Sequence, residues 1–574
     1  MPDRITYEEI LALASEREEV YGPMWAAMRK DWDCIIASAS WRNALIPEYV
    51  KGFPANYTPK VPPIAKKALE LFRTTVMVGE EPEVKIPLPK GMRSSKENRR
   101  KRTAMEDFAK AWVYNAATLS GINPFVDILN KQGGLGMGGI CAAFDFEKWP
   151  KPLADVDEET LEEYEKKKKC FPWKVSVISP RGFMPDPWHD PPEDYIIKDK
   201  LNARVARKLY PHLTAAAEKG KLERLIYCSK TDYAVYIGAE AALAGGVEDN
   251  PMGDLWYETV WSGNGELKED NEVEFLGQGI IRNARDTIAM IVQAINVAEI
   301  KRNVAAFTPL HYSAEDKTEA EEAARATVFG PDAILATSHR VKIETFPQAD
   351  MPREVVWTNE QMIMWLRIIY GQDILSGAST TDTATTLMKN ISLAEAPFKP
   401  MRVNAEQAWA NVLRKVFRFL ANELHDEQVS LPYRDGAIMT LNRADIIEGC
   451  PIEVNYKPPT DEERAFNAAR DAQLLELHQI SPEEFRRRQG IEEDEEEQQK
   501  ILEGLLMYHD AVVGASAMVI ANQIAPQPTP TGVVPEVPGV AQNGAGSDQR
   551  MQTSPQQVAV NQAQKMYEVP LGTQ

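Results

Sequence analysis

The sequence lacks the short motifs that identify several enzyme and binding classes. No glycine loop is followed by the G-K-[ST] of a Walker A site, and neither H-E-x-x-H nor G-x-S-x-G occurs. No run of about 18 uncharged apolar residues is present, so no membrane-spanning helix is expected. These absences argue against P-loop ATPases, metalloproteases, α/β-hydrolases and helical membrane proteins.

Cysteine is also scarce. The chain of 574 residues has five cysteines, which are widely separated and form no C-x-x-C pair. That pattern offers neither a disulfide framework nor a zinc or thiol redox motif. Residues 1–4 are polar, so we expect no secretory segment and a chain that is made and kept in the cytoplasm.

The balance of charge restricts the partners further. The 85 Asp and Glu residues outnumber the 65 Lys and Arg residues, for a formal net charge of −20. Proteins that grip nucleic acid by neutralising phosphates present a basic face, so the bulk charge argues against that class. An acidic wall would instead repel a DNA backbone and let it slide.

Helical periodicity is clearest after residue 279. A first helix carries one long apolar stripe, made of Ile280, Ala284, Ile288, Ile291, Val292, Ile295 and Ala298. A second helix begins at Pro352 and ends at Gly371, with Met362 and Leu366 on its buried side. Residues 304–351 between them predict a compact α/β module, with an acidic helix over 314–327 and β-type residues over 334–346.

A segment of small, hydroxylated residues follows the second helix. Its polar members are Ser376, Ser379, Thr380, Thr381, Asp382, Thr383, Thr385 and Thr386. Composition alone favours an ordinary flexible linker here. A third helical pattern starts at Leu387, and Pro397 and Pro400 predict a kink in it because each removes a backbone donor.

This order of elements resembles that of portal proteins of tailed bacteriophages or prophages, the rings through which such phages load and release DNA. In that family two stem helices flank a clip, a tunnel loop follows, and a long kinked helix comes next. Residues 173–187 are similar to the wing strand that enters a proline- and aspartate-rich turn, and residues 460–505 to the helical crown. The resemblance implies a mixed α+β fold, mainly helical, with wing, stem, clip and crown regions.

The resemblance also divides the chain. The wing covers residues 1–278, the stem helices 279–303 and 352–371, the clip 304–351 and the tunnel loop 372–386. Residues 387–459 hold the kinked helix and a β segment that completes the wing sheet, and residues 460–523 form the crown. Residues 524–574 are rich in Pro and Gln and almost lack Lys and Arg, so we expect a disordered tail.

As implied by the resemblance, the chain is a subunit of a homo-oligomeric ring, a dodecamer, at one capsid vertex. The ring serves packaging and ejection of double-stranded viral DNA, and it docks the terminase large subunit and later the head-to-tail adaptor. Major capsid and scaffold proteins are further partners. The expected location is the virion, after assembly in the host cytoplasm, with no membrane, no cofactor and no enzymatic activity.

The same resemblance assigns roles to residues. Apolar positions of the two stem helices would face neighbouring subunits, namely Ile288, Ile291, Val292, Ile295, Met362 and Leu366. The hydroxylated segment would project into the channel. Because no lysine or arginine lies between Gly371 and Met388, it would act as a steric collar that DNA slides past.

Two local patterns suggest alternatives. Residues 134–139 match G-x-G-x-x-G, the basis of a rival hypothesis of a nucleotide-binding enzyme, but a helix is predicted before them and a strand after them. That order favours a helix-to-strand turn. His189, with Asp186, Asp190 and Asp194 nearby, has no recognised metal-ligand spacing, so a surface loop without a metal is favoured. Another structural virion protein is the third hypothesis.

Overall fold

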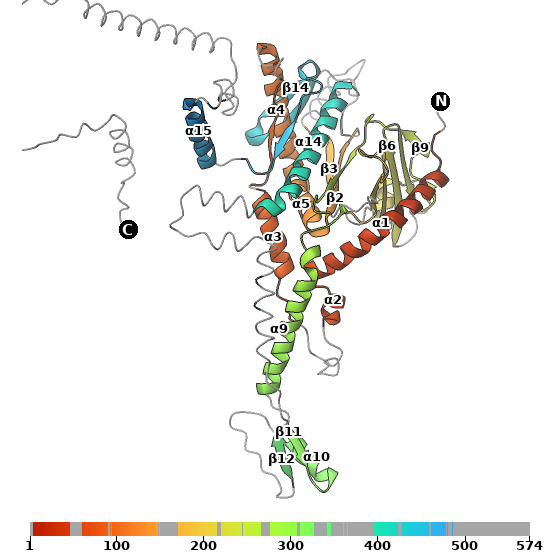
Figure 1. The fold of residues 1–574 in the computed structure, drawn as a ribbon. Helices are drawn as coiled ribbons and strands as arrows, with labels where there is room; N and C mark the ends of the chain where they lie inside the picture. Colours follow the sequence, from red (N-terminus) through yellow and green to blue (C-terminus); the bar gives the residue numbers. More distant parts are fainter. Residues whose placement is uncertain are drawn as a thin grey trace, which may run out of the picture. The chain divides into compact units, whose positions relative to one another are not determined.

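The computed structural model describes residues 4–45, 60–77, 79–89, 92, 95–146, 148–149, 170–214, 220–243, 245–265, 276–306, 310–326, 341–345, 360, 364, 395–422, 428–458, 461–477, 479 and 485. Residues 1–495 form one compact unit. Helices and strands alternate irregularly in it, as expected of an α+β chain (Figure 1). Among the described helices, none has the length and apolar character needed to cross a membrane.

The larger of two hydrophobic clusters is built by four helices, α3 (Ile64–Val76), α4 (Lys96–Leu119), α5 (Pro124–Leu135) and α14 (Lys399–Asn422). Phe108 and Trp112 lie one turn apart on α4, so both point to the same side. Trp112 and Trp409 of α14 are buried with ring centroids 6.4 Å apart, and Phe125 of α5 lies 4.3 Å from Trp409. These aromatic contacts hold the helices together.

Three small antiparallel sheets line this cluster. The largest has the order β10 (Tyr257–Trp261), β2 (Met137–Phe144), β3 (Trp173–Ile178), with Gly139 opposite Thr259 and Ile178. β1 (Glu83–Lys85) pairs with β15 (Glu453–Asn455), and β13 (Gln428–Pro432) pairs with β14 (Ile438–Asn442). Single 3-10 turns, η6 (Arg434–Gly436) and η7 (Arg443–Asp445), interrupt this last region.

The second cluster joins a six-stranded antiparallel sheet to the helix α1 (Tyr7–Ile35). The strands are β4 (Phe183–Pro185), β5 (Asp194–Asn202), β6 (Lys221–Ser229), β7 (Asp232–Ile237) and β8 (Glu240–Ala241), with β9 (Val247–Asp249) on β7. A capping box between Thr6 and Glu9 starts α1, and its buried face includes Ile10, Tyr21 and Met28. Figure 1 shows α1 beside this sheet. The short helices α2 (Ala39–Ala44) and α7 (Ala203–Leu209) follow α1 and β5 in the chain.

In the described part of the chain, the β segment of residues 387–459 does not pair with the sheet that contains β6 and β7. β13 and β14 form a hairpin of their own, and β15 pairs with β1. Two structural causes are clear. β8 and β9 already pair with β7, and α4 packs on the β13–β14 hairpin, where Asn115 donates its side-chain amide to the carbonyl of Pro432 at 2.6 Å.

A long helix and a small module follow residue 281. The 3-10 turn η4 (Arg282–Ala284) continues into α9 (Arg285–Ala306), and β11 (Leu310–Ser313), α10 (Lys317–Ala326) and β12 (Lys342–Thr345) come next. The predicted acidic helix is therefore present as α10. Further on, η5 (Ala396–Phe398) leads into α14, and α15 (Asp461–Glu476) lies in the range assigned to the crown.

Candidate functional site at the base of helix α9

The first half of α9 is part of the core of its own chain. Ile288 and Val292 have no exposed surface and Ile291 is 4% exposed, because this face packs into the large cluster beside α3. Ile295 is 38% exposed and Met290 on another face is 53% exposed. Of the four α9 positions predicted to face neighbouring subunits, Ile295 is therefore the one that keeps an exposed side chain.

A buried carboxylate fixes the start of α9 to α1. Asp31 of α1 has no exposed surface and accepts hydrogen bonds from Arg282 at 2.6 Å and from Arg285 at 2.9 Å. Burial raises the pKa of the Asp31 carboxyl above its ordinary value, and the two guanidinium groups oppose that shift. The network ties two segments about 250 residues apart in sequence.

The glycine-rich residues 133–139 pack against the segment that leads into α9. α5 ends at Leu135, and Gly136 caps it in the left-handed conformation at φ 86° and donates its N–H to the carbonyl of Gln132 at 2.8 Å. A Cβ on Gly136 would lie 2.3 Å from the backbone of Gly277, and the N–H of Ile280 donates to the carbonyl of Gly133 at 2.8 Å. The predicted helix-to-strand turn is confirmed, and the chain's own backbone occupies the space beside Gly136.

The last two glycines of the run, Gly138 and Gly139, lie in strand β2. A Cβ on Gly138 would meet Ile128 at 2.6 Å, and one on Gly139 would meet Phe183 at 2.7 Å. These glycines permit close packing of a helix and a second sheet on β2. A dinucleotide site needs the opposite order, with a strand before the glycines and a helix after them.

After the C-terminal end of α9, both α10 and β12 pack on β11. β11 and β12 are antiparallel partners, with Leu310 opposite Thr345 and Ser313 opposite Lys342. α10 follows directly and contacts β11. In Figure 1 the α9 ribbon leads into this helix-and-hairpin module. The module therefore has its own small sheet, and the chain reaches it through α9.

Several predicted site residues lie outside the described part of the chain. These are the hydroxylated segment with Ser376, Ser379, Thr380, Thr381, Asp382, Thr383, Thr385 and Thr386, and the second-helix positions Met362 and Leu366. Met364 is described and is 50% exposed. Pro397 falls in the 3-10 turn η5 and Pro400 in the first turn of α14, where a missing backbone donor costs no helical hydrogen bond. The pattern predicted before Pro397 also lies outside the described residues.

Strand β4 and the segment just before it are held against α1 by three side chains of that helix. Arg17 donates to the carbonyl of Met184 at 3.1 Å, Tyr21 to that of Pro185 at 3.0 Å, and Trp25 to that of Pro180 at 2.8 Å. The three donors are spaced four residues apart, so they share one face of α1. They satisfy carbonyls of the edge strand β4 and of Pro180 before it, directly ahead of the turn between β4 and β5.

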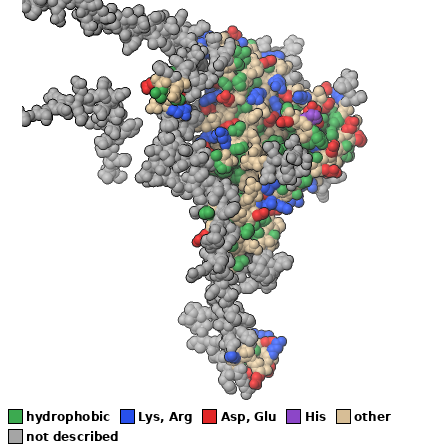
Figure 2. All heavy atoms as spheres, viewed as in Figure 1, with side chains coloured by type: hydrophobic (Ala, Val, Ile, Leu, Met, Phe, Trp, Pro, Cys, Tyr) green, Lys and Arg blue, Asp and Glu red, His purple; other side chains and the backbone are tan. Residues whose placement is uncertain are grey.

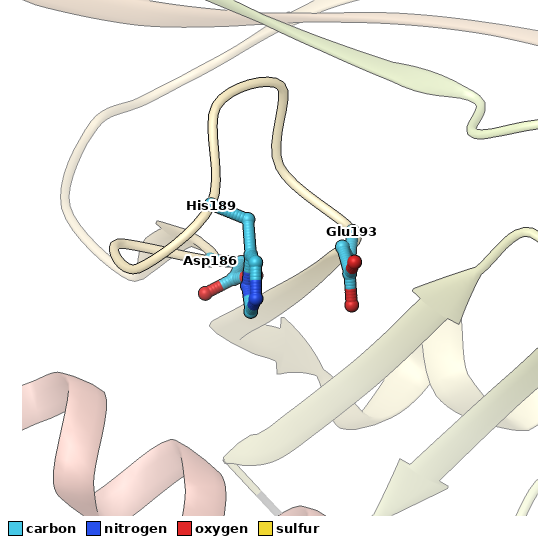
Figure 3. Close-up of side chains that lie close together, drawn as sticks. All are labelled: Asp186, His189 and Glu193. Atoms are coloured by element: carbon cyan, nitrogen blue, oxygen red, sulfur yellow. The ribbon is translucent and has the colours of Figure 1, made fainter.

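A histidine and carboxylates gather on this turn. Asp186 has a side chain 5% exposed, and its Oδ2 lies 2.6 Å from Nδ1 of His189, which is 55% exposed. The hydrogen bond to Asp186 raises the pKa of the His189 imidazole above its ordinary value. Glu193 brings a third ligand-type atom near both of them (Figure 3). Asp194, which the sequence pattern placed near His189, instead pairs with Arg17 at 2.5 Å.

Charges of both signs are mixed over the viewed face of the described residues (Figure 2). Many basic side chains of the described residues have acidic partners, as in the pairs of Arg418 with Asp254 at 2.5 Å and Lys415 with Glu258 at 2.7 Å. The formal charge of −20 therefore does not appear as one acidic patch on this face.

The Asp31 network was missed by sequence reasoning. Arg282 and Arg285 lie off the apolar stripe of this helix, and helical periodicity gives such polar positions no specific partner. The one usable signal was Asp31 itself, a carboxylate three residues after the apolar Met28 and three before Cys34.

Comparison with known proteins gives weak matches. No protein-family model matches this chain, and neither does any curated protein. Among solved structures, the neck of an empty gene transfer agent particle matches with a TM-score of 0.33 at 12% identity, over 75% of this chain and 90% of that one. The virion of a native gene transfer agent particle matches with a TM-score of 0.33 at 11% identity, over 79% and 99%. Values this low establish neither a shared fold nor a function.

Proposed function

We propose that this chain is a portal subunit, which forms a ring at one vertex of a phage-type capsid and surrounds the DNA that passes through it. The observation that carries the proposal is the course of α9. Its first half is fixed in the core by Ile288, Val292 and the Asp31 network, and the chain then continues into the β11–α10–β12 module. That is the stem-to-clip order implied by the sequence resemblance.

Exposed apolar side chains on the proposed stem support assembly. Met290 and Ile295 on α9 are 53% and 38% exposed, and Met364 is 50% exposed. Single exposed apolar residues are ordinary on any protein surface. On helices that would stand side by side in a ring, however, each repeats once per subunit and can be covered by the next copy.

In this proposal the core and the β11–α10–β12 module have different functions. The core holds the base of α9 at a fixed angle through Arg282 and Arg285 on Asp31. The module of β11, α10 and β12 would present its surface to the packaging motor and later to the adaptor. The hydroxylated residues 376–386 would line the passage, and ATP hydrolysis would belong to the motor.

Negative-stain electron microscopy and mass photometry of the purified full chain test the proposal. Rings of about twelve subunits with a central hole are expected. A compact particle without a hole would instead favour another structural virion protein. A persistent monomer under conditions that include capsid and scaffold protein would contradict the proposal.

Deleting residues 379–385 tests the passage-lining role. The ring should still form, whereas DNA retention or packaging should fall, because the collar around the DNA is shortened. A deletion of the same length at residues 540–546 in the predicted tail is the matched control, and it should leave packaging unchanged. A monomeric product of the first deletion would rule out the assignment of this segment to the passage.

A further inference from the structure

Three metal-ligating side chains meet on the turn between β4 and β5. The ligand atoms of Asp186, His189 and Glu193 all lie within 4.8 Å of one another. Figure 3 shows the Asp186 and His189 side chains close together, with Glu193 beside them at the other end of the turn. They come from one short stretch of chain that the hydrogen bonds of Arg17 and Tyr21 hold in place.

We propose that Asp186, His189 and Glu193 bind one divalent transition-metal ion of the zinc class. The donor set is an imidazole nitrogen and two carboxylate oxygens, which is typical of zinc and its neighbours and unlike the all-oxygen sites of calcium and magnesium. Three protein ligands leave one position for water.

The three ligand atoms must move closer together to bind one ion. Metal–ligand bonds of about 2.0–2.2 Å place neighbouring ligand atoms about 3–3.5 Å apart, whereas the present limit is 4.8 Å. His189 and Glu193 are exposed and can change rotamer, and the buried Asp186 is the fixed ligand. The backbone N–H of Trp188 donates to Oδ1 of Asp186 at 3.0 Å and leaves Oδ2 on the side of His189.

The surrounding charges favour a cation. Arg17 is the basic residue that reaches this turn from α1, and it pairs with Asp194 at 2.5 Å while lying 5.8 Å over the Trp188 ring. Tyr227 also reaches Asp194, at 3.4 Å. Asp194 is thus neutralised, and the carboxylates of Asp186 and Glu193 together balance a divalent ion bound with neutral His189.

The ion would close the base of the turn. Asp186 directly follows the last residue of β4, and Glu193 directly precedes the first residue of β5. A metal bridge between them links the two strand ends and gives the exposed Trp188 and His189 a fixed position. The role is structural, and it is independent of the proposed ring.

Titration of the chelator-treated full chain tests the site. Zn²⁺ is followed by calorimetry and Co²⁺ by its visible absorption, with one ion per chain expected. His189→Gln and Glu193→Gln should each weaken binding by about tenfold or more, because each removes one of three ligands. His212→Gln, another exposed histidine in a turn, is the matched control and should bind as the unaltered chain does.

Two results would overturn the proposal. One is the absence of saturable binding in the unaltered chain, which would make the Asp186–His189 contact an ion pair only. The other is equal affinity in His189→Gln and His212→Gln, which would place any bound ion elsewhere. Both altered side chains are exposed, so folding of the variants is checked simply by circular dichroism.

Discussion

Positions along and around helix α9 differ in what covers them. Ile288 and Val292 in its first half are covered by the chain's own core, whereas Ile295, further along the same apolar stripe, and Met290 on another face remain exposed. All four residues are apolar and lie within about two turns of one helix. An apolar residue on a long helix can therefore pack in the core of its own subunit or be left for contact with a neighbouring subunit. The burial of its side chain in the single chain distinguishes these two roles.

The largest expected effect on stability comes from shortening a side chain of α9 that is buried in the chain's own core. Ile288→Ala should destabilise the folded chain by about 2–5 kcal/mol, because it leaves a cavity in a closely packed core. Denaturant unfolding followed by fluorescence measures this. Met290→Ala is the matched control on the same helix; it should change stability by at most about 0.5 kcal/mol while weakening subunit association. Equal loss of stability in both variants would erase the contrast.

Removing the buried carboxylate should have the next largest effect. Asp31→Asn leaves Arg282 without its charged partner and Arg285 with the exposed Asp286, and we expect a loss of about 3 kcal/mol, at the lower end for a buried pair because both guanidinium groups retain some solvent contact. Asp286→Asn removes the exposed partner of Arg285 and should cost at most about 1 kcal/mol. Thermal unfolding of both variants compares the two carboxylates directly. Equal melting temperatures would mean that Asp31 does not fix α9.

A smaller loss of stability is expected when Gly136 is replaced. Gly136→Ala should cost about 1–3 kcal/mol, because φ is 86° and the new Cβ would collide with the backbone at Gly277. Gly121→Ala is the control, since a Cβ there meets nothing within 4 Å. Unfolding midpoints in denaturant decide between them. A Gly136→Ala chain as stable as Gly121→Ala would show that the base of α9 can move away from α5.

The smallest expected effect is on the pKa of His189, which lies on the turn between β4 and β5. The pKa of His189 is raised by Asp186, so the stabilisation from this pair is fully present below the unfolded pKa and is lost as pH rises through the folded value. Asp186→Asn should lower the His189 midpoint, measured by histidine hydrogen–deuterium exchange and mass spectrometry in metal-free buffer. Asp249→Asn, which alters an exposed carboxylate elsewhere, should leave that midpoint unchanged. An unshifted midpoint in Asp186→Asn would mean that the 2.6 Å contact is not maintained in solution.

Local patterns predicted local structure well. The helix before Gly136 and the strand after it follow from short-range signals, a glycine at a helix end and apolar residues in the next strand. The acidic helix α10 was predicted for the same reason. Nearest-neighbour preferences act within a few residues, so they are visible in the chain itself.

Long-range partners could not be predicted in the same way. The apolar stripe of α9 has one period throughout, so periodicity cannot show that Ile288 meets the chain's own core while Ile295 does not. The pairing of β1 with β15 joins residues 83–85 to 453–455, and no feature of either short segment specifies the other. Such contacts are selected by the packing of the whole chain.

The spacing of Arg17, Tyr21 and Trp25 on α1 limits how this chain can vary in length. One inserted or deleted residue turns the following part of an α-helix by about 100°, so a change between Arg17 and Trp25 would carry at least one donor away from the carbonyls of Pro180, Met184 and Pro185. Substitutions on the exposed side of α1 do not change the positions of these three residues around the helix. Among related chains, this stretch should therefore accept amino-acid replacements yet stay free of gaps.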